Sequence, residues 1–205
     1  MPTTSSGTGC LPKMAQLDIS KHAAFIRRCL NLLPPSAAHL DLNRMSLGFF
    51  LLNSLDILNK LDTETSAEER SQWIDWIYSC QLHTGGFRGS TATKTSEASI
   101  YDTVHLPAAY FSIATLLILG DDLKRVNRKG MLHQLKKLQN EDGSFSPVLL
   151  GEERYGEVDV RHVYCAIAVR EMLSPICDEE DFDVIAAINY IQQCKVPFLL
   201  RDYLR

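Results

Sequence analysis

Three residue types that bind zinc recur at every third position in the segment EVDVRHVYC, at Asp159, His162 and Cys165. Carboxylate, imidazole and thiolate are common zinc ligands. On an α-helix, however, the directions of Asp159 and Cys165 differ by about 120°, so the three cannot converge on one ion unaided. A second pair, Cys80 and His83, is equally incomplete. The spacing favours packing and helix capping, and we assign no metal ligand and no catalytic residue in this chain.

The segment GGFRGS, residues 85–90, could be taken for a loop that binds phosphate. Such loops follow a strand and have a different glycine spacing. No strand is expected before Gly85, so the two glycines are predicted to end a helix, with Phe87 in the core.

Arg161 and Tyr164 lie one helical turn apart, directly after Asp159. An arginine near a helix N-terminus within apolar surroundings either pairs with a carboxylate or serves an anionic ligand. The residues alone slightly favour the pair with Asp159.

Ser46, Phe49 and Phe50 are spaced three and four residues apart, which places them on one side of a helix. A helical face of this kind is usually part of the core.

The composition is that of an ordinary globular protein, with 205 residues, 45% hydrophobic, 22% charged and a net charge of -4. The basic residues are scattered, which argues against nucleic acid as a partner. No signal peptide is expected, and no segment has the about 18 consecutive apolar residues of a membrane span. The six cysteines show no paired spacing, so reduced thiols and a cytoplasmic location are expected.

Helical periodicity dominates the chain, and no strand is predicted. The expected caps are Ser20, Asp41, Ser66 with Glu69 as a capping box, and Asp159. The expected helices span residues 21–33, 42–59, 71–82, 104–120, 128–139, 160–173 and 181–194.

Two kinds of helix alternate from residue 71 onward. Residues 71–82, 128–139 and 181–194 are amphipathic, whereas 104–120 and 160–173 are apolar on most faces. Because an amphipathic helix keeps one solvated side, the first kind should form an outer layer around the second.

A repeated plan links these helices. Gln81 and Gln139 each end an amphipathic helix and are followed by a glycine turn and a phenylalanine. About the same interval leads from Gln139 to Gln193, where no glycine follows. The pattern predicts stacked helical-pair repeats.

Several segments resemble the β subunits of the protein prenyltransferases: GGFRGS, HLPAAYFSIATLLILGDDL, LQNEDGSF and EVDVRHVYCAIAVREML. Within that family, KHAAFIRRCLNLLP, NRMSLGFF and ILGDDLKRVN are most similar to the geranylgeranyltransferase type I β subunit. The resemblance implies an all-α fold, an α/α toroid, here as an incomplete ring over residues 20–194. Residues 1–19 are expected to be a disordered segment, and residues 195–205 a tail unrelated to the family.

The resemblance also implies an activity, the transfer of geranylgeranyl from its diphosphate to the cysteine of a C-terminal Cys-aliphatic-aliphatic-X box. The family works as a heterodimer with an α subunit, on proteins such as Rho-type small GTPases, and a zinc ion holds the thiolate. Its zinc ligands, an Asp-x-Cys pair and a later His, are not found in this sequence.

The resemblance gives roles to the five residues singled out above. Arg161 and Tyr164 would line the cavity beside the lipid and the peptide. Ser46, with Phe49 and Phe50, would border the far end of the lipid tunnel, where farnesyl enzymes carry a bulky Trp. A small residue there implies geranylgeranyl diphosphate as the lipid.

A different class of function stays open. The chain could be a noncatalytic helical-repeat protein that binds a partner helix or a lipid. If the chain is instead a geranylgeranyltransferase type I β subunit, we expect it to be truncated and inactive alone.

Overall fold

A computed structural model describes residues 17–32, 35–94, 102–173 and 181–194. The prediction of a helical protein is confirmed. The elements in chain order are α1 (Ile19–Asn31), the 3₁₀ helix η1 (Pro35–Asn43), α2 (Arg44–Ile57), α3 (Leu61–Glu64), α4 (Ala67–Ser79), the 3₁₀ helix η2 (Thr91–Thr93), α5 (Leu106–Ile118), α6 (Arg128–Leu138), β1 (Val148–Leu150), β2 (Glu153–Tyr155), α7 (Val160–Met172) and α8 (Val184–Gln193).

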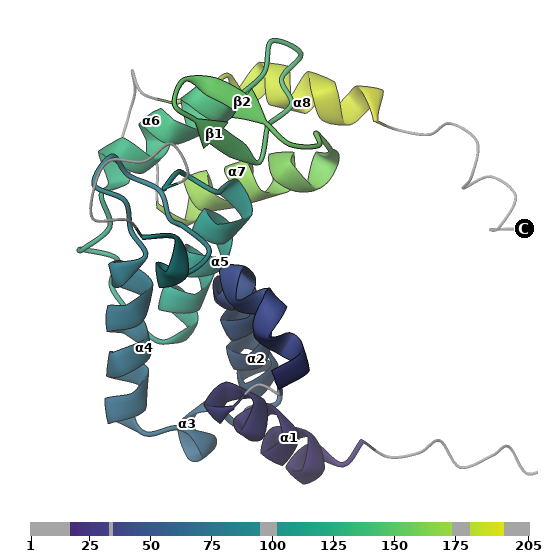
Figure 1. Ribbon diagram of the computed structural model, residues 1–205. Coiled ribbons are helices and arrows are strands. Elements are labelled where there is room, and N and C mark those ends of the chain that lie inside the picture. Colours follow the sequence, from purple (N-terminus) through teal and green to yellow (C-terminus); the bar gives the residue numbers. More distant parts are fainter. Residues whose placement is uncertain (1–16, 33–34, 95–101, 174–180, 195–205) are drawn as a thin grey trace, which may run out of the picture.

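The helices form two layers, as the alternation of apolar and amphipathic segments predicts. In the inner layer α2 packs against α5, and α5 packs against α7, while α4 and α8 lie against α5 and α7 from outside. The most apolar helix, α5, fully buries Leu106, Ile113 and Leu116. Figure 1 shows α5 at the centre of the described molecule, with α1 and α8 toward opposite ends.

The two glycine turns have the predicted conformation. Gly85 and Gly143 have φ values of 92° and 86°, a left-handed backbone that glycine adopts without steric cost. The phenylalanines that follow, Phe87 and Phe145, are fully buried, which confirms the prediction for Phe87. Each turn thus ends an outer helix and fills the core beside it.

Two glutamines couple each outer helix to the next one in the same way. The Gln81 side chain accepts from the Asn127 backbone N–H at 2.7 Å and donates to the Arg125 carbonyl at 3.1 Å. The Gln139 side chain accepts from the Asp183 N–H at 2.8 Å and donates to the Asp183 carbonyl at 2.7 Å. These couplings hold the backbone at the starts of α6 and α8, and they are the structural basis of the repeat seen in the sequence.

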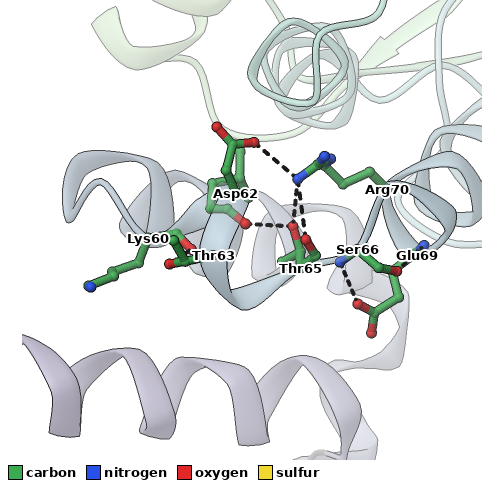
Figure 2. Close-up of polar contacts among 8 residues, drawn as sticks. Lys60, Asp62, Thr63, Thr65, Ser66, Glu69 and Arg70 are labelled. Atoms are coloured by element: carbon green, nitrogen blue, oxygen red, sulfur yellow. Dashed lines mark hydrogen bonds and ion pairs between the residues drawn. The ribbon is translucent and has the colours of Figure 1, made fainter.

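The capping box at α4 is confirmed. Ser66 Oγ accepts from the Glu69 N–H at 3.1 Å, and Glu69 Oε2 accepts from the Ser66 N–H at 2.9 Å. Figure 2 shows Arg70 next to this box, donating to Thr65 Oγ1 at 3.1 Å and pairing with Asp62 at 3.1 Å. The turn from α3 into α4 is therefore fixed by side chains from both helices.

Two expected caps are wrong. At α1 the carboxylate of Asp18 accepts from the Lys21 N–H at 3.0 Å, so the helix begins at Ile19 and Ser20 lies in its first turn. Asp18 also pairs with the Lys21 ammonium group, an interaction that a serine hydroxyl does not offer.

At α2 the preceding residues form η1, so Asp41 lies inside that 3₁₀ helix and Asn43 is at the cap position. Asp41 instead pairs with the side chain of Arg44. An aspartate just before a helical segment predicts a helix cap. When an arginine follows three residues later, the same aspartate can form a local ion pair instead.

No strand was predicted from the sequence, and this prediction is wrong. Val148–Leu150 pairs antiparallel with Glu153–Tyr155, with Gly151 in the turn at a φ of 62°. Three-residue strands are too short to show alternation in a sequence. This hairpin is held by its surroundings, because Leu149 is buried and the Leu106 N–H donates to the Pro147 carbonyl at 2.8 Å.

Some expectations fall outside the described residues. Residues 1–16 and 195–205 do so, and the division into segments 1–19, 20–194 and 195–205 stays a prediction.

Of the described cysteines, Cys29, Cys80, Cys165 and Cys194 are all free thiols. In the described part of the chain, every helix is too short or too polar to cross a membrane.

Candidate functional site

Five aromatic side chains from the three inner helices form a continuous row, here called the aromatic row. Ring centroids lie 5.0 Å apart for Phe49 and Phe111, 5.8 Å for Phe49 and Tyr110, and 5.3 Å for Tyr110 and Tyr164. Phe50 joins it at 5.5 Å from Phe111. These spacings are those of favourable aromatic pairs, worth about 0.5–1.5 kcal/mol each beyond burial.

One edge of the aromatic row is open. Phe49 is only 8% exposed, whereas Phe50 and Tyr164 are 56% and 59% exposed, on α2 and α7. Contiguous aromatic surface of this kind on a folded protein marks a place where apolar groups bind. The arrangement can hold a hydrocarbon chain by dispersion and exclusion of water.

The two tyrosines of the row are joined through their hydroxyl groups. Tyr110 Oη and Tyr164 Oη lie 3.1 Å apart, a hydrogen bond. Burial, and then the hydrogen bond to Tyr164, raises the pKa of Tyr110 to about 12. Tyr110 is therefore uncharged at neutral pH, and its polar end is satisfied within the row.

Ser46 lies on α2, one turn before Phe49 and Phe50, and its hydroxyl donates to the Asn43 carbonyl at 2.8 Å. The expected common face divides into a buried and an exposed side, because Phe49 points into the core and Phe50 does not. Both phenylalanines nevertheless belong to the aromatic row. The place of Ser46 at the end of a lipid tunnel stays a prediction.

Arg161 is held by Asp159 at the start of α7. Asp159 Oδ1 accepts from the Arg161 backbone N–H at 2.7 Å, as the predicted cap requires, and Arg161 Nε donates to Asp159 Oδ2 at 3.0 Å. The side-chain hydrogen bond from Arg161 is the main reason that the pKa of Asp159 falls to about 2. The Arg161 side chain remains 79% exposed, so the pair orients its guanidinium group without enclosing it.

Asp159, His162 and Cys165 do not fit a zinc ion. The Asp159 carboxylate is engaged by Arg161. Burial raises the pKa of the Cys165 thiol to about 11 and lowers the pKa of His162. Across the four described ranges, no group of three or more His, Cys, Asp or Glu residues could hold a metal ion.

Two members of the row, Tyr110 and Phe111, were not identified from the sequence. They lie in PAAYFSIATL, where neighbouring residues are small or apolar, so the segment indicates only a buried helix. The available signal was the adjacent aromatic pair on an inner helix, which matches Phe49 and Phe50 on α2.

The paired layers, the glycine turns and the couplings through glutamine define an α/α toroid architecture. The chain matches the prenyltransferase alpha-alpha toroid domain over residues 17–197 and belongs to that family.

The chain is similar to the geranylgeranyl transferase type-1 β subunits of two organisms. It is 34% identical to that of Dictyostelium discoideum, over 87% of this chain and 55% of the relative. It is 29% identical to that of Arabidopsis thaliana, over 88% of this chain and 49% of the relative. The chain thus spans about half the length of these relatives.

A solved structure shares the fold. It is Candida albicans protein geranylgeranyltransferase-I complexed with GGPP, which aligns with a TM-score of 0.77 and 28% identity, over 87% of this chain and 51% of that chain. The expected resemblance to prenyltransferase β subunits is confirmed.

Proposed function

We propose that this chain acts as a geranylgeranyltransferase type I β subunit, or as a part of one, and that it holds the isoprenoid of geranylgeranyl diphosphate. The aromatic row carries the proposal. It crosses all three inner helices, and its exposed members, Phe50 and Tyr164, provide apolar surface where a long hydrocarbon chain can lie.

Ser46 accounts for the length of the lipid. Its side chain lies one turn from Phe49 and Phe50 and uses its hydroxyl on the Asn43 carbonyl, so it presents little bulk to a ligand. A tryptophan at this position would fill space that a fourth isoprene unit needs. The proposed preference is therefore for geranylgeranyl over farnesyl diphosphate.

Arg161 supplies a positive charge on α7, across α5 from Ser46 on α2. Because its guanidinium group is oriented by Asp159 yet exposed, it can donate to an anionic group of the lipid or the peptide. In this role Arg161 binds and orients the substrates.

Further parts of the proposal rest on the family. The reaction would be geranylgeranyl transfer to the cysteine of a Cys-aliphatic-aliphatic-X box, in a heterodimer with an α subunit, on substrates such as Rho-type small GTPases. Zinc would hold the acceptor thiolate and lower its pKa. Since Asp159, His162 and Cys165 do not fit, no zinc ligand is assigned to the described residues.

The test is lipid selectivity. In a heterodimer with an α subunit, dissociation constants and kcat/KM for geranylgeranyl and farnesyl diphosphate are measured for the wild-type chain and for Ser46→Trp. We expect Ser46→Trp to shift the ratio at least tenfold toward farnesyl. The matched control is Ser71→Trp, on the exposed face of the outer helix α4, which should leave the ratio unchanged.

An unchanged ratio in Ser46→Trp would remove Ser46 from the site. If neither diphosphate binds to the wild-type heterodimer, the proposed function fails, and a noncatalytic helical-repeat protein becomes the better description.

A further inference from the structure

A hollow lies between α1, η1, α2 and α4, separate from the open edge of the aromatic row. Its volume is about 830 Å³. Phe49 lines it and also belongs to the aromatic row, so this side chain is a shared wall. Gly48, which also lines it, is about 160° around α2 from Phe50. The hollow therefore lies within the wall of the fold, on the side of α2 turned toward the outer helices.

Gly48 leaves free space in this hollow. In the middle of a helix, glycine is less favourable than alanine by about 1 kcal/mol. Gly48 has no left-handed backbone, and a Cβ added to it would meet no atom within 4 Å. Neither the backbone nor the packing requires glycine here. What its missing side chain provides is free volume next to Arg44 and Leu51 on the same side of α2.

The walls of the hollow suit a hydrocarbon chain. The chain has 2 tryptophans, Trp73 and Trp76, and both line the hollow from α4, opposite leucines of α2. The volume lies within the range of about 300–1,000 Å³ found for small-molecule sites, which are mostly apolar with a few polar groups.

Arg44 is the basic side chain among the lining residues. Its side chain is 53% exposed, and Asp41 engages one of its terminal nitrogens. A guanidinium group has five N–H donors, so a carboxylate or phosphate can bind Arg44 alongside Asp41. Arg44, with its partner Asp41, thus lies at the solvent side of a hollow whose other lining residues are mostly apolar.

We propose that this hollow is a second lipid site, which binds a single-chain amphiphile with an anionic head group. The hydrocarbon chain lies against Trp73 and Trp76 in the space left by Gly48, and the head group binds Arg44. This site does not depend on the proposed function, because Gly48, Arg44 and both tryptophans are outside the aromatic row.

The two tryptophans make the site directly observable. The probe is cis-parinaric acid, a straight-chain fatty acid whose polyene accepts energy from tryptophan, titrated into the full 205-residue chain. We expect saturable energy transfer from Trp73 and Trp76. Gly48→Leu should raise the dissociation constant at least tenfold. Gly48→Ala, which adds one methyl group and favours the helix, should change it less than threefold.

A second measurement does not depend on fluorescence. Cys29 lines the hollow, so bound palmitate should slow its alkylation by iodoacetamide, followed peptide by peptide by mass spectrometry. The exposed Cys194 is the internal control and should react at an unchanged rate.

Competition distinguishes the two sources of such a ligand. Displacement of the probe by palmitate, and not by geranylgeranyl diphosphate, assigns the site to fatty acids; the reverse assigns it to prenyl diphosphates. Arg44→Gln should weaken either anion several-fold and leave a long-chain alcohol unaffected. The proposal is overturned if Gly48→Leu binds the probe as the wild type does, if palmitate and geranylgeranyl diphosphate both leave Cys29 unprotected, or if the alcohol binds as tightly as the acid.

Discussion

At the residue scale, Asp159 connects the fold to the candidate site. It caps α7 through the Arg161 backbone N–H and orients the Arg161 side chain with the same carboxylate. These contacts lower the pKa of Asp159 to about 2, below its value of about 3.9 in an unfolded chain. A lowered carboxyl pKa contributes stability that is present above about pH 4 and is lost as the pH falls toward 2.

Arg161→Ala should separate binding from stability. Because its side chain is exposed, the ion pair contributes little, and the free energy of unfolding should change by less than about 1 kcal/mol. In the proposed heterodimer, the affinity for geranylgeranyl diphosphate or for the acceptor peptide should fall several-fold, as measured by equilibrium binding. Lys124→Ala removes another exposed partner of an aspartate, Asp122, and is the control for charge. Unfolding of Arg161→Ala, with Lys124→Ala intact, would show that Arg161 is structural.

At the element scale, the glycine turns determine how one helical pair meets the next. A Cβ on Gly143 would lie 2.0 Å from the Ala186 carbonyl oxygen of α8, and one on Gly85 would lie 2.2 Å from the Gly130 carbonyl carbon of α6. Both turns therefore need glycine twice, for the left-handed backbone and for the close approach of a neighbouring helix.

Gly143→Ala and Gly120→Ala should separate these two causes. Both glycines have a left-handed backbone, with φ values of 86° and 82°, but a Cβ on Gly120 would have no atom within 4 Å. Gly120→Ala should cost about 1–2 kcal/mol for the backbone alone, and Gly143→Ala should cost at least about 2 kcal/mol more because α8 must move. Urea unfolding curves measure both. Equal losses would mean that α8 tolerates displacement.

The sequence predicted the helices well, because their apolar periodicity is local. It predicted the capping box of Ser66 and Glu69 for the same reason. It did not predict the hairpin at Val148, whose strands depend on contacts with His105 and Leu106 far away in the chain. At the candidate site, Arg161 and Ser46 were singled out by their spacing, and the family resemblance supplied their roles. The continuity of the aromatic row through Tyr110 depends on how α2, α5 and α7 pack, which the sequence did not predict.

At the scale of the whole molecule, apolar side chains remain exposed on α7 and α8. Val160 and Tyr164 on α7, and Ile185 and Ile188 on α8, are all exposed, with Ile185 at 67%. The helices α7 and α8 pack against each other, and a contiguous apolar surface on a folded protein is a candidate site for association. In the proposed heterodimer or a larger toroid, part of this surface would be covered.

Ile185→Glu should therefore change the surface and not the core. The change should alter the free energy of unfolding by less than about 0.5 kcal/mol, as is usual for exposed positions. It should reduce binding of a hydrophobic dye and self-association of the isolated chain, as measured by dye fluorescence and light scattering. Ala187→Glu, at a fully buried position of the same helix, is the contrasting variant and should unfold the protein. If Ile185→Glu associates as strongly as the wild type does, the association uses another surface.

The glutamine couplings also bear on how such a chain can change during evolution. Gln81 reaches Asn127 across 46 positions, whereas Gln139 reaches Asp183 across 44, yet each glutamine accepts from a backbone N–H and donates to a backbone carbonyl. Each link binds backbone atoms, so it is indifferent to the side chains at the receiving helix and to the length of chain between. Insertions and deletions between the couplings can therefore accumulate without changing how successive helical pairs are placed. We therefore expect loop lengths to differ among relatives more than the placement of successive helical pairs.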